Sequence, residues 1–369
     1  MFSAAKIASP TSSGYNLTNS LRFRASASAY LNRTFGAGTS DQKFTISVWV
    51  KRGALGATSC IMSNANSIPG SNEAQFVFNN TDNLRFYTSG GTYSVITTQV
   101  FRDPSAWYHL VCQVDVTQAT AANRVIMYVN GVQITSYGTA NYPPQNTNIG
   151  FNNAYAHGIG AYVATPTQFF DGYIAEFNFI DGQALTPSSF GSYNSTTGVW
   201  QPAKYTGTYG TNGFYLPFTN TTSTTTLGYD SSGNGNNWTT NNISITAGVT
   251  YDSMTDVPTL TSATAANFAV WNPLDFAGSP TFSNGNLYAA GAFKTRSTMA
   301  LPSGVKTYVE IYQTGTASTV DVFCGLVGTS NALAVHPNPG VDWYATDTIY
   351  GSLNGSTSFS FDRFDRNTR

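Results

Sequence analysis

The chain has 369 residues, of which 9% are charged and 14% are aromatic, and its formal net charge is −1 at pH 7. With so few charges and no excess of lysine or arginine, it lacks the basic surface of a nucleic-acid-binding protein or of a protein held on an anionic membrane. The aromatic content excludes a disordered chain. No apolar run has the length of a transmembrane helix or a signal peptide, so we expect no membrane insertion.

Residues 1–19 show no hydrophobic periodicity, and we expect them to form an N-terminal arm. After them, short segments of alternating apolar and polar residues follow one another, separated by glycine and asparagine turns. The clearest of these strand patterns lie at residues 44–51, 107–116, 124–134 and 170–185. Asn130-Gly131 within the third pattern is a strong hairpin signal, because both turn positions need a positive φ.

The pattern at 170–185 is bracketed by two Asp-Gly pairs. Strict alternation predicts that one face of this strand is fully apolar and carries Tyr173, Ala175, Phe177 and Phe179. Glu176 then lies on the opposite face. Thr186 and Pro187 predict the start of a short helical turn behind the strand.

Because no long helical pattern occurs, the sequence predicts an all-β fold, an antiparallel two-sheet sandwich followed by a second β-sandwich domain. We assign the first sandwich to residues 20–245, a linker to 246–265 and the second domain to 266–369. The clearest strand patterns of the second domain lie at 306–313 and 319–327. That domain shows no obvious closing strand, and an open sheet edge needs a cover, so we expect homo-oligomers.

One candidate binding site is a loop rich in amide and aromatic side chains. Such loops bind sugars by ring stacking and by hydrogen bonds from amides. The candidate glycan-binding residues are Tyr142, Asn152, Asn153, Tyr155 and His157. The alternative is a loop that only faces solvent or a neighbouring subunit.

A second candidate is a metal site in which oxygen-bearing side chains stand at the first, third and fifth loop positions, namely Asp230, Ser232 and Asn234. Gly235 follows at the sixth, so the segment matches half of a calcium loop. Asn241 stands where such a loop carries its bidentate glutamate. An Asx-rich turn is therefore the alternative, and Ca²⁺ is the single candidate cofactor.

No catalytic residues emerge from the sequence. The glutamates Glu73, Glu176 and Glu310 are far apart, as are the three histidines, and no Gly-x-Ser-x-Gly motif occurs.

The strand patterns carry a family resemblance over about residues 20–200. The motifs Trp107-Tyr108-His109-Leu110, Tyr128-Val129-Asn130-Gly131 and Asp171-Gly172-Tyr173-Ile174-Ala175-Glu176 resemble, in this order, core strands of laminin-G-like domains. The resemblance implies the concanavalin A-like jelly roll. Glycosidases with that fold place two or three carboxylates at alternate positions on one strand, and Glu176 has no such partner on its own strand.

A narrower resemblance links the chain to virion proteins of marine bacteriophages. It rests on Val48-Trp49-Val50-Lys51-Arg52-Gly53 and on Gly198-Val199-Trp200-Gln201-Pro202. In that group an SPRY-type β sandwich often follows the laminin-G-like domain, and Tyr308-Val309-Glu310-Ile311 is similar to its early strands. Residues 213–238 resemble a strand and loop that come first in many laminin-G-like domains. We therefore expect them to fold back as a permuted strand near residues 21–24.

These resemblances imply a non-enzymatic structural protein of a bacteriophage virion, assembled in the host cytoplasm as a tail-fibre, appendage or capsid-decoration subunit. Its expected partners are other virion proteins, further copies of itself and host surface polysaccharide. One alternative is a secreted or cell-surface glycan-binding adhesin, which a signal peptide would favour. The other is a polysaccharide depolymerase, which a facing carboxylate pair would favour.

Overall fold

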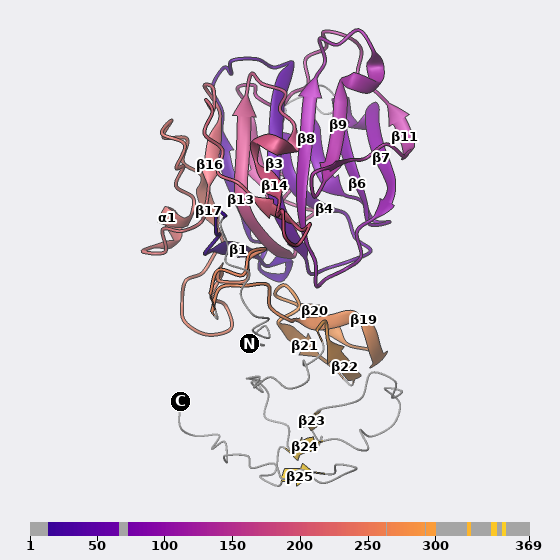
Figure 1. Cartoon of the computed structure of the whole chain (residues 1–369), viewed down its shortest axis with the longest axis vertical. Helices are drawn as coiled ribbons and strands as arrows, with labels where there is room; N and C mark the ends of the chain where they lie inside the picture. Colours follow the sequence, from indigo (N-terminus) through magenta and orange to yellow (C-terminus); the bar gives the residue numbers. More distant parts are fainter. Residues whose placement is uncertain are drawn as a thin grey trace.

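The structure is a computed structural model. It describes residues 14–65, 73–262, 264–291, 293–299, 323–325, 341–344 and 349–351. Two antiparallel sheets face each other in the upper part of Figure 1, where the chain is coloured from indigo to rose. This arrangement confirms the predicted all-β class and the two-sheet sandwich.

Sheet 1 has eight strands in the order β10-β9-β8-β3-β13-β1-β18, and β16 pairs with β13 beside this path. Its strands are β10 (Val132–Gln133), β9 (Val125–Val129), β8 (Trp107–Asp115), β3 (Lys43–Arg52), β13 (Gly172–Asp181), β1 (Ser20–Phe23), β18 (Ser253–Met254) and β16 (Phe214–Leu216).

Sheet 2 also has eight strands, in the order β11-β7-β6-β5-β4-β12-β2-β17. Its strands are β11 (Tyr137–Asn141), β7 (Tyr93–Val100), β6 (Asn83–Thr88), β5 (Ala74–Phe78), β4 (Ser59–Ala65), β12 (Ala156–Ile159), β2 (Tyr30–Thr34) and β17 (Thr239–Asn241).

The main core lies between these two sheets, because alternate residues of each strand point inward. Phe44, Ile46 and Val48 of β3 belong to this core, and so do Phe76 and Phe78 of β5. The intervening residues of β3 point to the outer face of sheet 1. There the chain itself covers them with two smaller apolar clusters.

The central strand β13 does not keep the strict alternation that its sequence predicts. Its pairing with β3 shifts between Ala175 and Asn178, and Glu176 has a φ of +51°, so a β-bulge interrupts the strand. Phe177 therefore points into the main core, whereas Ala175 belongs to an outer cluster. The predicted single apolar face is wrong, because an extra residue at the bulge reverses the parity.

The segment after the last predicted strand returns to the sandwich. β1 pairs with β13 at Gly172 to Ile174, and β16 pairs with β13 at Phe177 to Phe179. The two short strands therefore lie end to end along one edge of β13, on either side of its bulge. β17 then adds to sheet 2 beside β2. Residues 214–241 are thus part of the first sandwich.

The expected arm and linker both contribute described residues to sheet 1 and its cover. Leu17 packs in an outer cluster together with Met254 and Val257. Ser253–Met254 forms β18, the edge strand next to β1. The segment 246–265 therefore packs on the sandwich instead of spanning a gap.

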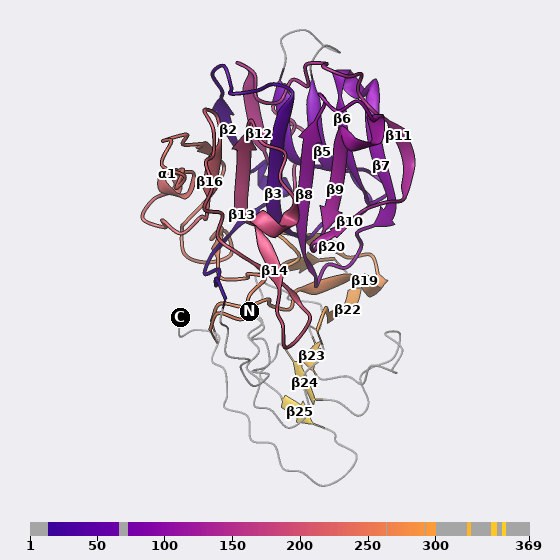
Figure 2. The ribbon, with the colours of Figure 1, turned by 45° about the horizontal axis from the view of Figure 1, so that its top comes forward.

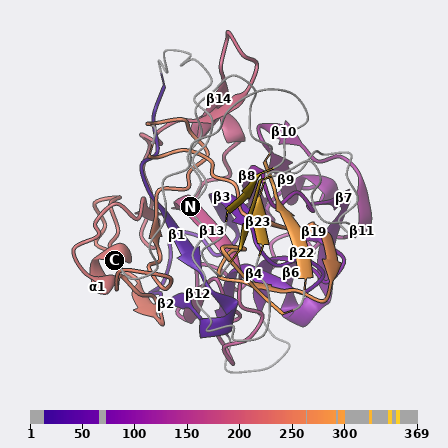
Figure 3. The same cartoon turned by 90° about the horizontal axis from the view of Figure 1, so that it is seen from below.

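Three two-stranded ribbons lie outside the two large sheets of the described chain. β14 (Gly191–Tyr193) and β15 (Trp200–Pro202) form a hairpin, β19 (Trp271–Gly278) pairs with β22 (Phe293–Ser297), and β20 (Thr281–Ser283) pairs with β21 (Tyr288–Ala290). The last two ribbons lie across the lower end of the sandwich in Figures 1 and 2, and Figure 3 shows that end from below.

The remaining elements are short. β23 (Phe323–Gly325), β24 (Val341–Tyr344) and β25 (Ile349–Gly351) form a three-stranded sheet. The strand expected at 306–313 lies outside the described residues. The helices are α1 (Thr224–Leu227) and the 3₁₀ turns Ala25–Ala27, Ser89–Gly91, Ala121–Asn123 and Pro187–Ser189. Among the residues that the structure describes, no helix has the length and apolarity to cross a membrane.

Candidate functional site

Two of the five candidate glycan-binding residues are buried inside the protein. Asn152 is 1% exposed, and its amide donates hydrogen bonds to the Ser40 carbonyl and to the Asp181 carboxylate. His157 is 0% exposed and stacks on Phe35, with ring centroids 3.8 Å apart. Burial lowers the pKa of His157 to about 3, so its ring is neutral near pH 7. These two side chains hold the loop in place and do not face a ligand.

The other three candidates are half-buried. Tyr142 packs against the main core. The Asn153 amide donates to Asn148 Oδ1 over 2.9 Å. The Tyr155 carbonyl contacts His157 Nδ1 over 2.9 Å, and the Tyr155 side chain remains partly open. The loop thus presents fewer sugar-binding groups than its composition indicates.

The three candidate metal ligands form an Asx-type turn whose acceptors are already occupied. Asp230 Oδ1 accepts from the backbone N–H groups of Tyr215 and Ser232, at 2.9 and 2.8 Å. Asp230 Oδ2 accepts from the Ser232 hydroxyl and the Asn236 N–H, both at 2.8 Å. The Asn234 amide donates to the Gly210 and Gly213 carbonyls. These hydrogen bonds fit a closed turn that fixes β16.

The outer face of sheet 1 places a serine beside a histidine. Ser47 Oγ lies 2.9 Å from His109 Nε2, and both residues are 1% exposed. The indole N–H of Trp200 donates to His109 Nδ1 over 2.9 Å. Because an indole can only donate, Nδ1 carries no proton, so Nε2 holds the proton of the neutral ring and donates it to Ser47. Burial lowers the pKa of His109 to about 3, which favours this neutral form.

This tautomer has the wrong polarity for nucleophilic catalysis. A general base would have to accept the Ser47 proton at Nε2. Here the hydrogen bond from the Trp200 indole leaves Nε2 as the donor, and Trp49 stacks on the imidazole. The group is a packed polar layer beneath the β14–β15 hairpin.

Glu176, at the bulge of β13, is held in a second polar group on the same face. Its Oε2 accepts a hydrogen bond from the Tyr215 hydroxyl at 2.8 Å and one from the Tyr15 hydroxyl at 3.3 Å. The two hydroxyls lie 2.6 Å apart. Burial raises the pKa of Glu176 to about 7. Its direct side-chain partners in the described chain are the hydroxyls of these two tyrosines, and it is itself 4% exposed.

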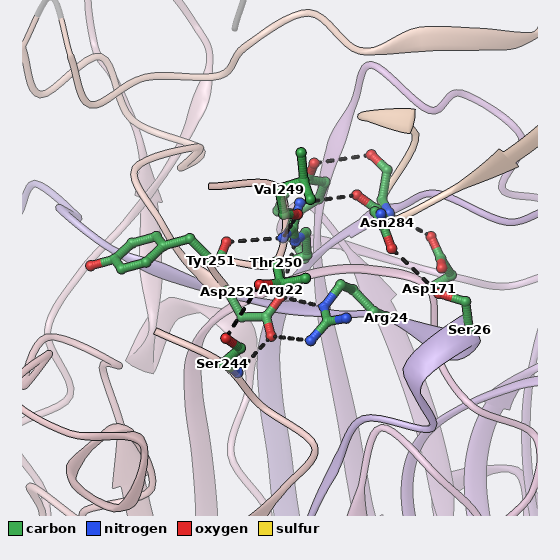
Figure 4. Close-up of polar contacts among 12 residues, drawn as sticks. Arg22, Arg24, Ser26, Asp171, Ser244, Val249, Thr250, Tyr251, Asp252 and Asn284 are labelled. Carbon is green, nitrogen blue, oxygen red and sulfur yellow. Dashed lines mark hydrogen bonds and ion pairs between the residues drawn. The ribbon is translucent and has the colours of Figure 1, made fainter. Parts of the chain in front are cut away.

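A buried charged cluster joins β1 to the expected linker (Figure 4). Asp252 accepts from Arg22 Nε at 3.1 Å and from Arg24 Nε at 2.8 Å, and its side chain is 0% exposed. Arg22 also donates to the carbonyls of Val249 and Tyr251. Each charge in the cluster has a partner inside the protein, so the cluster serves structure and not ligand binding.

A second buried ion pair fastens the same segment further along. Lys51 Nζ lies 2.7 Å from Asp256 Oδ2, and the Trp107 indole donates to Asp256 Oδ1 over 2.9 Å. Asp171 accepts from the Gly285 N–H over 2.7 Å, which fixes the turn between β20 and β21. The lower ribbons are thereby attached to the end of the sandwich.

The outer face of sheet 2 carries a polar and aromatic patch that was not identified from the sequence. Gln75 of β5 pairs with Tyr87 of β6, and Tyr87 pairs with Ser94 of β7. Arg85, two residues before Tyr87 on β6, points to the same side. We call these four residues, with Glu73, the outer patch. The neighbouring residues Phe76, Phe86 and Val95 point into the main core.

The members of the outer patch hold one another in fixed positions. The Arg85 guanidinium lies over the Tyr87 ring, 4.3 Å from its centroid, and Arg85 Nε donates to Ser94 Oγ over 2.9 Å. The Tyr87 hydroxyl and the Gln75 amide donate to Glu73 Oε1 over 3.1 and 3.2 Å. In the described part of the chain Gln75 Oε1 has no hydrogen-bond partner. Only the alternation at Gln75, Arg85 and Tyr87 signalled this arrangement in the sequence.

Residues 24–191 match the family described as the Concanavalin A-like lectin/glucanases superfamily. A search of curated proteins found no match to the chain.

Three solved structures are similar at low identity. A proposed carbohydrate-binding protein from Bacteroides ovatus is 19% identical with a TM-score of 0.40, and the match covers 62% of this chain and 59% of that one. The SAP-like pentraxin of Limulus polyphemus is 15% identical with a TM-score of 0.33, covering 47% of this chain and 80% of that one. Domain 4 of the arabinanase AbnA from Geobacillus stearothermophilus is 22% identical with a TM-score of 0.30, covering 41% and 65%.

The matched segment runs from the end of β1 to the hairpin strand β14 and contains the central strands β3, β8 and β13 of sheet 1. Residues 24–191 therefore form the main part of a concanavalin A-like jelly-roll domain.

Proposed function

We propose that the protein is a non-enzymatic structural subunit of a bacteriophage virion that binds surface glycan through the outer patch of sheet 2. The observation that carries the glycan part is the fixed set of Arg85, Tyr87, Gln75 and Glu73 on one sheet face. Tyr87 and Gln75 are buried and hold the half-buried Arg85 and Glu73 in place, so the patch presents a pre-oriented donor and a pre-oriented acceptor to a sugar. The virion part rests on the resemblance of the sequence motifs to phage virion proteins.

Two arrangements of side chains support the proposal that the protein is not an enzyme. His109 donates to Ser47 instead of accepting from it, since the Trp200 indole N–H occupies Nδ1. Glu176 is buried, and the Tyr215 and Tyr15 hydroxyls occupy its Oε2, so it does not face a substrate. Both arrangements favour binding over a polysaccharide depolymerase.

A glycan array with the purified full chain tests the binding activity. We expect retention of a defined set of glycans, together with no release of reducing ends when the same glycans are incubated with the protein for hours. Release of oligosaccharides would overturn the non-enzymatic assignment. Failure to retain any glycan at protein concentrations near 100 μM, a range typical of weak binding, would overturn the binding assignment.

The location is tested separately. We expect mass spectrometry of purified phage particles to detect the chain, and immunogold labelling to place it on the fibre, the appendage or the capsid surface. The glycan-binding adhesin of a cell surface remains the second candidate function, because the outer patch suits it equally. Detection on intact host cells and not in particles would select it.

The second domain and the assembly belong to the same proposal. We propose an SPRY-like second β domain, other virion proteins as partners and further copies of the chain in a homo-oligomer. Size-exclusion chromatography with light scattering of the full chain tests the last point, and a monomer at micromolar concentration would contradict it.

A further inference from the structure

We infer that the outer patch selects glycans that carry a carboxylate, such as hexuronic acids, and that Arg85 binds this group. The inference deepens the proposed glycan binding and rests on it. It rests on how the Arg85 side chain is held and on its two Nη groups, which have no hydrogen-bond partner in the described chain.

Arg85 is fixed at two points. Its guanidinium plane lies over the Tyr87 ring, 4.3 Å from the centroid, and its Nε donates to Ser94 Oγ on the neighbouring strand. Ser94 is 7% exposed and Tyr87 is 9% exposed, so both supports are themselves packed. A side chain held in this way has already lost much of the rotational freedom that binding would otherwise remove.

The far end of the same side chain is free. Within the residues that the structure describes, the Arg85 Nη1 and Nη2 groups have no hydrogen-bond partner, and no acidic side chain forms a salt bridge with them. Arg85 itself is half-buried. This contrasts with Arg22, Arg24 and Arg52, whose guanidinium groups are bound inside the protein.

A guanidinium with two free nitrogens matches a planar carboxylate through two parallel hydrogen bonds. Two neighbouring hydroxyls of a neutral sugar can also accept from this fork, but they carry no charge. The preference for a carboxylate therefore follows from its charge, which strengthens both hydrogen bonds.

The rest of the outer patch suits the hydroxyl groups of such a sugar. Glu73 is half-buried and accepts from Tyr87 and Gln75 at Oε1, and Tyr162 also hydrogen-bonds to its carboxylate. Gln75 is 1% exposed, so its amide orients the Glu73 carboxylate from inside the protein and does not face a ligand. A carboxylate has acceptor sites for about four hydrogen bonds, so the exposed part of Glu73 can still accept from a sugar hydroxyl. Arg85 thus binds the acid group, and Glu73 accepts from the hydroxyls.

The experiment is calorimetric titration of the full chain with three probes of equal length. They are an oligogalacturonate, the same oligomer with its carboxyl groups reduced to alcohols, and a sulfated neutral galactan oligomer. The variants are Arg85→Gln and Arg85→Lys. Arg102→Gln is the matched control, since the Arg102 side chain is 52% exposed and lies outside the outer patch.

We expect the oligogalacturonate to bind about tenfold or more tightly than the reduced oligomer, the scale of one added charge-assisted bidentate contact. Arg85→Gln should abolish this preference, Arg85→Lys should restore only part of it, and Arg102→Gln should leave it unchanged. Equal binding of the acidic and reduced oligomers, equal binding of the sulfated oligomer, or an unaltered preference in Arg85→Gln would overturn the inference. Lack of binding by all three probes and by every glycan of the array would instead overturn the proposed function.

Discussion

The hydroxyl of Tyr215 donates a 2.8 Å hydrogen bond to Glu176 Oε2, at the point where a β-bulge interrupts the central strand of sheet 1. The other carboxyl oxygen, Oε1, is buried and has no hydrogen-bond partner in the described structure. Burial raises the pKa of Glu176 to about 7, against an ordinary value of 4.5. This carboxyl is therefore the group on which the pH dependence of stability can be tested most clearly.

Between pH 4.5 and about 7 the folded chain binds a proton at Glu176 that the unfolded chain has released. Stability from this group is fully present below pH 4.5 and is lost as the pH rises through about 7. We expect the unfolding free energy of the wild type to fall by up to about 3 kcal/mol more than that of Glu176→Gln between pH 4.5 and 8. Urea denaturation at both pH values measures this difference. Parallel pH profiles for the two proteins would refute the assignment.

The buried charged cluster predicts an asymmetry between two aspartates. Asp252→Ala leaves Arg22 and Arg24 without their shared carboxylate in a site where the Asp252 side chain is 0% exposed. We expect a loss of about 3–5 kcal/mol in unfolding free energy. Asp275→Ala is the control, because Asp275 pairs with Arg296 while 36% exposed. There we expect a change below about 1 kcal/mol. Equal effects in chemical denaturation would show that burial does not set the cost.

The Asp230 turn predicts a stability effect without a calcium effect. Asp230→Ala removes the acceptor for Tyr215, Ser232 and Asn236, and we expect a loss of about 1–3 kcal/mol. Differential scanning fluorimetry of the wild type should show the same melting temperature in excess calcium and in EDTA. A calcium-dependent rise that Asp230→Ala abolishes would establish the metal site instead.

The Ser47–His109 pair predicts chemical inertness. Because Trp200 donates to His109 Nδ1, the imidazole cannot accept the Ser47 proton. We expect a fluorophosphonate probe to leave Ser47 unlabelled in the native wild type and also in Trp200→Phe, where the indole donor is gone but the serine remains buried. Intact-protein mass spectrometry reads the result, and one added phosphonyl group on Ser47 would contradict it.

The sequence predicted the sandwich because alternation is a local property, and residues such as Phe44, Ile46 and Val48 express it without interruption. It could not predict the bulge at Glu176, since no local residue pattern marks the extra residue that reverses the faces of β13. The sequence assigned residues 246–265 to a linker, whereas Asp252 and Asp256 of this segment are buried with Arg and Lys partners more than 200 positions earlier.

For the candidate sites too, the sequence showed the local composition but not which residues the fold buries or brings together. Composition drew attention to the loop with Asn152 and His157, but burial turns both inward. The outer patch joins Gln75, Arg85 and Ser94 from three strands, and their proximity depends on the pairing register, which the sequence leaves open.

The most direct test of the account compares two tyrosines for a glycan that the array identifies. Tyr87→Ala removes the ring beneath Arg85 and the hydroxyl on Glu73, whereas Tyr155→Ala alters the loop that composition indicated. With both variants checked for an unchanged circular dichroism spectrum, we expect titration calorimetry to show an affinity loss of about tenfold or more for Tyr87→Ala and no loss for Tyr155→Ala. Loss confined to Tyr155→Ala, with full affinity in Tyr87→Ala, would contradict the placement of the binding site on the outer face of sheet 2.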